Sequence, residues 1–105
     1  MAQIELLRKI KKRLKALYGN RFKGLVLYGS DARGDATDES DIDLLCLLDG
    51  KVDPVKEIAP IINAISSLQN AYPDRAISIK AISIIDFEKG SFPLCIEAKK
   101  EGVFV

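Results

Sequence analysis

Apolar residues recur with two different periods along this chain, and the change from one period to the other predicts the order of its elements. Residues 2–20 repeat apolar side chains every three or four positions, which is typical of an amphipathic helix, and Gly19 supplies its end. Residues 22–29, FKGLVLYG, form a short apolar run before a glycine and predict a buried strand. We expect the helix to pack through Leu7, Ile10, Leu14 and Leu17.

The middle of the chain predicts two more strands with a long helix between them. Residues 30–40 are rich in turn formers and leave room for one short helix, and residues 41–48, DIDLLCLL, then predict a strand. Residues 75–84 alternate and predict the third strand. Helical spacing marks residues 54–70, where Pro60 should kink or interrupt the helix because it removes a donor and crowds the preceding turn. The expected packing face of this helix is Val55, Ile58, Ala59, Ile62, Ile65 and Leu68.

Two short helices, over residues 85–89 and 94–101, complete the expected order, and Gly102 ends the second. The order α-β-α-β-α-β-α predicts an α/β (α+β) fold, with a small mixed sheet covered by helices. A chain of 105 residues is long enough for one core, so we expect one domain over residues 1–105.

Composition narrows the chemistry and the cellular setting. Histidine is absent, which excludes Ser-His-Asp and Cys-His catalysis and any histidine-liganded metal. Cys46 and Cys95 stand among apolar residues and are expected to be buried. No apolar stretch approaches the roughly 20 residues of a spanning helix, and the basic N-terminal segment is not followed by the apolar core of a secretory signal, so a cytoplasmic protein with no membrane partner is expected.

The net charge of +1 conceals an acidic concentration, since six of the thirteen residues from Asp31 to Asp43 are acidic. Asp41 and Asp43 alternate on the second strand, so their side chains should share one face while Ile42 points into the core. Two carboxylates about 6 Å apart repel by roughly 3 kcal/mol at an effective dielectric near 20. A divalent cation offsets that repulsion, and Mg²⁺ suits it because it takes one or two carboxylates and completes its shell with water and phosphates. A solvated cluster without a cation is the simpler alternative.

Gly29 and Ser30 end the preceding strand, where backbone N–H groups and a hydroxyl can cradle a phosphate. Together with the aspartates, the segment GSDARGDATDESDIDLL resembles the Gly-Ser, ten residues, Asp-x-Asp signature of the DNA polymerase beta-like nucleotidyltransferase superfamily. Within this segment the residues ARGD and SDIDLL, together with the shortness of the chain, resemble the minimal nucleotidyltransferases. The resemblance implies the nucleotidyltransferase fold and a nucleotidyl transfer from ATP or another nucleoside triphosphate to a hydroxyl acceptor.

The resemblance also implies roles for individual residues. Gly29 and Ser30 would bind the terminal phosphates, and Asp41 and Asp43 would be the catalytic residues and the ligands of Mg²⁺. Arg33 would be either a phosphate contact or a salt-bridge partner of the acidic loop, and Ser40 would cap or hydrogen-bond the aspartates. The acidic side chains expected to be merely solvated are Asp31, Asp35, Asp38 and Glu39.

The third strand departs from the superfamily pattern, in which a further carboxylate helps to hold the metal and accepts the proton of the attacking hydroxyl. Residues 75–83 contain no acidic residue, and Ser78 and Lys80 occupy the expected polar face. Asp74 is the nearest substitute and Asp86 a more remote one. The residues expected to bind the nucleotide are therefore present, whereas no residue is evident that could accept the proton of the attacking hydroxyl.

Partners follow from the same resemblance. Minimal nucleotidyltransferases are commonly paired with a helical HEPN protein in a toxin–antitoxin module, where the nucleotidyltransferase neutralises its partner by attaching adenylate to a tyrosine or by binding alone. The apolar run of residues 92–98 could support self-association or a core role. A rival interpretation is a nucleic-acid-binding module, because the first helix carries Lys9, Lys11, Lys12, Arg13 and Lys15.

Overall fold

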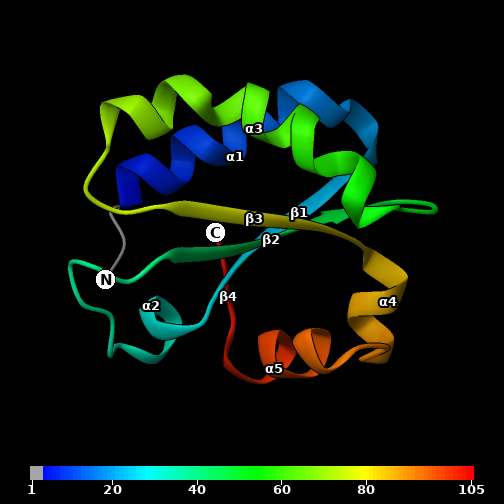
Figure 1. Cartoon of the computed structure of the whole chain (residues 1–105). Coiled ribbons are helices and arrows are strands. Elements are labelled where there is room, and N and C mark those ends of the chain that lie inside the picture. The colour runs from blue at the N-terminus through cyan, green and yellow to red at the C-terminus, as the bar shows by residue number, and fades with distance from the viewer. Residues whose placement is uncertain (1–3) are drawn as a thin grey trace.

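A central four-stranded sheet divides the molecule into two layers of helices, as Figure 1 shows. The computed structural model describes residues 4–105. The helices are α1 (Ile4–Tyr18), the 3-10 turn η1 (Gly19–Arg21), α2 (Ser30–Arg33), α3 (Pro54–Ala71), α4 (Ile84–Lys89) and α5 (Pro93–Glu101), and the strands are β1 (Phe22–Tyr28), β2 (Ile42–Leu48), β3 (Ile77–Ser83) and β4 (Val103–Phe104).

The strands lie in the order β3-β2-β1-β4, with β1 antiparallel to both β2 and β4 and β2 parallel to β3. This confirms the expected mixed sheet, and the predicted helices and strands fall within about two residues of those observed. The edge strand β4 was not predicted. It has only two residues, too few to show a hydrophobic period.

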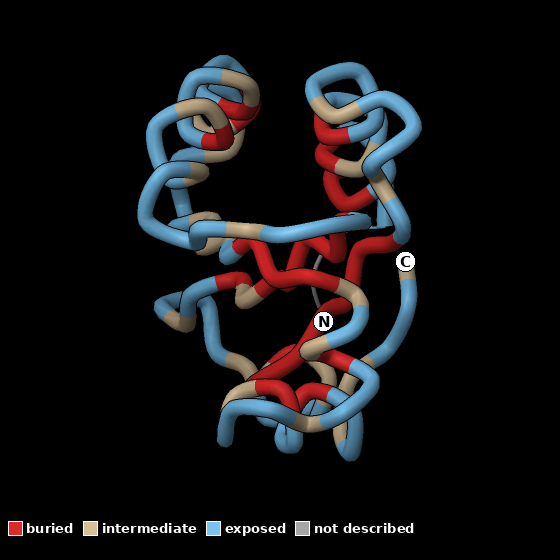
Figure 2. Tube along the Cα trace, turned by 90° about the vertical axis from the view of Figure 1, so that its right-hand side faces the viewer, coloured by how far each residue is buried: buried red, intermediate tan, exposed pale blue. Residues whose placement is uncertain are grey.

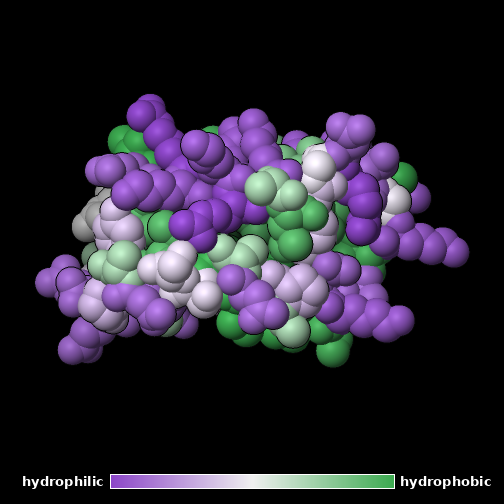
Figure 3. Space-filling model, turned by 90° about the horizontal axis from the view of Figure 1, so that it is seen from above, coloured by the Kyte–Doolittle hydropathy of each residue, from purple (hydrophilic) through white to green (hydrophobic). Residues whose placement is uncertain are grey.

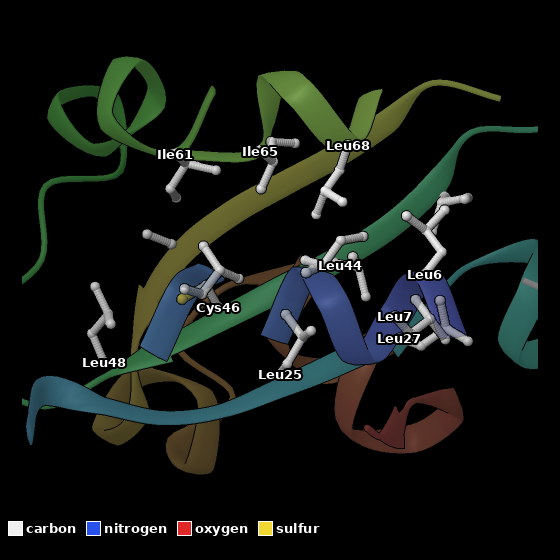
Figure 4. Close-up of a cluster of buried hydrophobic side chains, with 14 residues drawn as sticks. Leu6, Leu7, Leu25, Leu27, Leu44, Cys46, Leu48, Ile61, Ile65 and Leu68 are labelled. Carbon is white, nitrogen blue, oxygen red and sulfur yellow. The ribbon is translucent and has the colours of Figure 1, made fainter. Parts of the chain in front are cut away.

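The core lies on both faces of β2, which explains its almost unbroken apolar sequence. Alternate side chains of β2, among them Leu44 and Cys46, pack beneath α1 and α3, where the close-up in Figure 4 shows them against Ile61 and Ile65. The other set, Leu45 and Leu47, packs against α4 and α5. In Figure 2 burial is accordingly concentrated along the strands and on the helix sides that face them.

Helix α1 confirms most of its expected face, because Leu7, Ile10 and Leu14 are buried. The prediction is wrong for Leu17, which is 40% exposed, and it missed Leu6, which is buried. The buried stripe of α1 thus lies nearer its N-terminal end, and η1 follows its last turn directly.

Helix α3 packs through a face that overlaps the predicted one only in part: Ile65 and Leu68 are buried as expected, and Ile61 was missed. Ile61, Ile65 and Leu68 are buried, whereas the expected Val55, Ile58 and Ile62 are exposed. Pro60 does not interrupt the helix, which runs unbroken from Pro54 to Ala71. The side chain of Asp53 caps its start, accepting hydrogen bonds from the backbone N–H groups of Val55 and Lys56 at 3.1 and 3.4 Å.

Candidate functional site

The end of β1 and the start of β2 meet at one end of the sheet, beside α2 (Figure 1). Antiparallel pairing sets Tyr28 opposite Asp43, and Gly29 and Ser30 follow Tyr28 directly. The glycine-serine turn and the aspartate pair, separated by ten residues in the sequence, are therefore neighbours in space. This is the candidate functional site.

Gly29 is required here for two reasons. Its φ of +73° and ψ of −150° are accessible almost only to glycine. A Cβ at this position would lie 2.6 Å from Oδ2 of Asp43, closer than real Cβ atoms come to any group. The missing side chain thus lets the Asp43 carboxylate lie directly against the turn from which α2 starts.

The aspartate pair flanks Ile42, whose side chain is 2% exposed in the core beneath α1 and α3. Alternation turns Asp41 and Asp43 to the other face, the first exposed and the second partly buried. The pKa of Asp43 is raised, first by its burial and then by the negative charges of Asp41, Asp31 and Glu97, while the Lys80 ammonium lowers it. Negative charge at this carboxylate is thus only partly compensated by the protein.

The neighbouring strand β3 contributes a hydroxyl and an ammonium group to the same face. Its parallel register places Ser78 opposite Asp43 and Lys80 opposite Leu45. Nζ of Lys80 lies 3.5 Å from the hydroxyl of Tyr28, so this side chain reaches across β2. The pKa of Tyr28 is raised to about 12, mainly by burial and then by the charges of Asp43 and Glu97.

Neither acidic substitute considered from the sequence reaches this face. Asp74 lines a cavity of about 610 Å³ together with Leu6 and Ile42, residues that belong to the opposite face of the sheet. Asp86 lies in the first turn of α4, beyond the far end of β3. The carboxylate that the sequence lacks on β3 is therefore not supplied by either residue.

Sequence reasoning missed a buried ion pair at the edge of the site. Asp31, expected to be solvated, has a side chain with no exposure and forms a bidentate pair with Arg75. Nε of Arg75 also donates to the carbonyl of Ser40 at 2.7 Å, and Nη2 donates to the carbonyl of Asp41 at 3.3 Å. Forty-four positions separate the two residues, so no local pattern could have paired them.

The remaining predicted residues surround the aspartates without touching them through their side chains. The backbone N–H of Thr37 donates a hydrogen bond to the hydroxyl of Ser40 at 3.0 Å, which closes a turn. Arg33 pairs with Asp35 and with Glu101 of α5, at 3.3 and 3.2 Å. Of the two roles left open for Arg33, the salt bridge is the one this structure contains.

The donor set suits a cation that brings its own further ligands. Within residues 4–105, no three acidic or thiol side chains converge as a complete metal site. Two carboxylates beside a phosphate-sized turn match Mg²⁺ bound to a triphosphate, since that ion keeps water and phosphate oxygens in its shell. The raised pKa of Asp43 indicates that added positive charge would be favourable here.

No helix within residues 4–105 has the length and apolar character needed to cross a bilayer.

This chain is similar to several known proteins. A protein of Methanocaldococcus jannaschii named as a putative protein adenylyltransferase is 49% identical over 45 residues, which cover 43% of this chain and 45% of that relative. The match thus spans less than half of the relative's length. Two solved toxin–antitoxin structures share the fold at 19% identity. One, named MntA-HpeT, has a TM-score of 0.62 over 100% of this chain and 72% of that one; the other, with AMP-PNP, has 0.60 over 92% and 69%.

The family model described as the nucleotidyltransferase domain matches residues 7–105 and therefore includes the glycine-serine turn, both aspartates and all four strands. The chain belongs to the nucleotidyltransferase domain family.

Proposed function

We propose that this chain is a cytoplasmic, Mg²⁺-dependent nucleotidyltransferase that binds ATP or another nucleoside triphosphate and modifies a hydroxyl group on a partner protein. The observation that carries this proposal is the contact between the Asp43 carboxylate and the Gly29 turn. This contact supports a metal-ligating role for the aspartate pair, because Asp43 lies against a segment suited to phosphate. The adenylyltransferase name of the relative supports the type of reaction.

Each residue has a defined task in this reaction. Gly29 and Ser30 hold the terminal phosphates through backbone N–H groups and the hydroxyl. Asp41 and Asp43 would hold Mg²⁺, which supplies charge neutralisation at the triphosphate and orients the α-phosphate. The acceptor oxygen forms a bond to the α-phosphorus, the bond from that phosphorus to the bridging oxygen breaks, and pyrophosphate leaves. The hydroxyl proton passes to solvent, because β3 offers Ser78 and Lys80 in place of a carboxylate.

The toxin–antitoxin neighbours support a partner protein as the acceptor. Two solved structures with this fold are toxin–antitoxin complexes, and one is described with AMP-PNP. The resemblance to the minimal nucleotidyltransferases extends this proposal to a partner of the HEPN type, with a tyrosine hydroxyl as the modified group.

The test combines the purified chain, its co-purifying partner, Mg²⁺ and ATP, followed by intact-mass measurement of the partner. The expected result is a mass gain of one or more adenylyl groups, about 329 Da each by the composition of the transferred group. The chain carrying both Asp41→Asn and Asp43→Asn should give no gain and should lose Mg²⁺-dependent nucleotide binding in calorimetry. Unchanged nucleotide affinity in that double variant would remove the proposal.

Inhibition by binding alone is a second candidate function, and Lys80 favours it. An ammonium group beside Asp43 competes with a second metal ion and cannot accept a proton while charged. In this case the chain binds Mg²⁺ and ATP and neutralises its partner without a mass gain. The variant Lys80→Asp then tests the cause, since transfer that arises only in this variant would identify Lys80 as the block.

Nucleic-acid binding through α1 receives less support from the contacts of its basic side chains. Lys9 bonds the hydroxyl of Tyr72 at 3.2 Å, and Lys11 bonds the carbonyl of Val105 at 2.8 Å. Arg13 bonds the carbonyl of Ala64 at 3.1 Å and the hydroxyl of Ser67 at 2.9 Å. These groups tie α1 to its surroundings. RNA binding that survives the double aspartate substitution would favour this role over nucleotidyl transfer.

A further inference from the structure

The Arg75 guanidinium, distant in the sequence, joins two segments of the acidic loop region. It forms a bidentate pair with Asp31 in α2 and donates to the carbonyls of Ser40 and Asp41, in the loop that leads into β2. The planar fork of arginine is the side chain that can satisfy so many acceptors at fixed angles.

The segments that Arg75 joins are the two halves of the candidate site. Asp31 follows Ser30 of the phosphate-binding turn directly, and the carbonyl of Asp41 belongs to one of the two metal-ligating residues. The Asp31 side chain is fully buried and that of Arg75 is only 16% exposed. Solvent therefore screens this ion pair little. Removing Arg75 would leave the Asp31 carboxylate buried without its positive partner, which is destabilising.

We propose that Arg75 is a positioning residue, which fixes the separation between the Gly29–Ser30 turn and the Asp41–Asp43 pair. It thereby sets the affinity for a triphosphate bound through Mg²⁺. This inference rests on the proposed function of the same site. Arg75 itself lies behind the aspartates, bonded to backbone carbonyls, and is given no contact with the nucleotide.

Arg21 offers a matched control at the other end of β2. Its Nε and Nη2 donate to the carbonyls of Asp49 and Lys51, at 3.4 and 3.3 Å, in the loop that follows β2. Arg75→Lys and Arg21→Lys therefore remove the same kind of fork from the two loops that flank one strand. Only the first of these loops carries a residue of the candidate site.

The experiment measures ATP binding by calorimetry over a range of Mg²⁺ concentrations, at a temperature where circular dichroism shows both variants folded. Arg75→Lys should weaken ATP binding at least about tenfold and raise the Mg²⁺ concentration for half-maximal binding, since misplacement by about 1 Å can cost about 100-fold in a reaction. Arg21→Lys should leave both values within about twofold of the wild type. A merely structural role would lower the melting temperature without moving the Mg²⁺ requirement.

Wild-type affinity and Mg²⁺ requirement in folded Arg75→Lys would overturn the inference while leaving the proposed function intact. Failure of the wild-type chain to bind ATP with Mg²⁺ would instead overturn the proposed function, and the inference with it. If Arg75→Lys does not fold, Asp31→Asn replaces it, because that variant keeps the Arg75 guanidinium that bonds the loop and removes the charge of Asp31. It should weaken Mg²⁺-dependent ATP binding by several-fold, and wild-type affinity would again overturn the inference.

Discussion

Gly29 and Gly50 both have positive φ, at +73° and +79°, but only Gly29 has a neighbour where a side chain would stand. Gly50→Ala should cost about 1–2 kcal/mol of stability from backbone strain alone. Gly29→Ala should cost about 1–3 kcal/mol from its conformation, with a further loss from the clash with Asp43. Urea denaturation of the two variants measures both values.

The two glycine variants should differ more in binding than in stability. Gly29→Ala displaces the Asp43 carboxylate and should abolish Mg²⁺-dependent ATP binding in calorimetry. Gly50→Ala has open space around its new Cβ and should bind as the wild type does. Normal binding by Gly29→Ala would mean that the contact between the turn and Asp43 has no part in nucleotide recognition.

The charge of Asp43 should destabilise the fold when no metal is present. Its pKa is raised in the folded state, so the folded protein holds this proton to higher pH than the unfolded chain does. The penalty is therefore fully present above the folded-state pKa and disappears as the pH falls below the ordinary aspartate value of about 3.9. Asp43→Asn should accordingly raise the melting temperature in EDTA at pH 7 by up to a few degrees.

The pH dependence supplies the check on that prediction. The melting temperatures of Asp43→Asn and wild type, followed by scanning calorimetry in EDTA, should converge as the pH is lowered from 7 towards 4. A lower melting temperature for Asp43→Asn at pH 7 would show instead that Lys80 compensates the carboxylate completely. Added Mg²⁺ with ATP should reverse the order of the two proteins, because only the wild type retains both ligands.

At this scale the sequence predicts residues whose signal is local and misses those whose role depends on the fold. Gly29, Asp41 and Asp43 stand within fifteen positions of one another, at the ends of two strands that the hydrophobic pattern reveals. Asp31 is buried and pairs with Arg75, which stands just before β3 and lies near Asp31 because β3 pairs with β2. An acidic residue in a turn-rich loop is most often solvated, and nothing nearby marks Asp31 as the exception.

Helix α3 provides the clearest test among the elements, because two adjacent isoleucines have opposite surroundings. Ile61 is 2% exposed and points toward the sheet, as Figure 4 shows, while Ile62 is 56% exposed. Ile61→Ala should cost about 2–5 kcal/mol, through lost burial and the cavity left behind. Ile62→Ala should stay within about 0.5 kcal/mol of the wild type. Equal losses in urea denaturation would contradict the orientation of α3.

The orientation of α3 could not be read from its sequence because apolar residues occupy more than one side of it. Val55, Ile58, Ile62 and Ile65 follow helical spacing as well as Ile61, Ile65 and Leu68 do. The choice between these faces is made by the shape of the sheet beneath. Figure 3 views the helical layer from outside, where hydrophilic atoms predominate and apolar groups show between them.

Helix α1 was predicted more closely because only one side of it is apolar. Its Lys and Arg residues exclude the other sides, so Leu7, Ile10 and Leu14 had no rival face. The interruption considered at Pro60 does not occur, for a different reason. A proline six residues after the first residue of a helix removes one internal hydrogen bond, and the packing of Ile61, Ile65 and Leu68 offsets that loss.

For the whole molecule, the nearly neutral net charge is less informative than its distribution. Residues 1–23 carry eight Lys and Arg against one acid, so the rest of the chain is acidic. The site contains two carboxyl side chains and one lysine, from Asp41, Asp43 and Lys80. A free triphosphate would therefore meet net negative charge there, and a free Mg²⁺ would find only two protein ligands.

Mg²⁺ and ATP should consequently stabilise the protein much more when both are present than when either is added alone. With Mg²⁺ and ATP at about 100 times their joint dissociation constant, binding adds about 2.7 kcal/mol to the free energy of unfolding. Scanning calorimetry should show a clear rise in melting temperature with both ligands, and shifts near zero with ATP in EDTA or with Mg²⁺ alone. If ATP in EDTA stabilised as strongly as ATP with Mg²⁺, the aspartates would have no role in holding the nucleotide, and Lys80 and the glycine-serine turn would suffice. A strong shift with both ligands that is lost on Asp41→Asn with Asp43→Asn would tie the stability of the whole fold to this one end of its sheet.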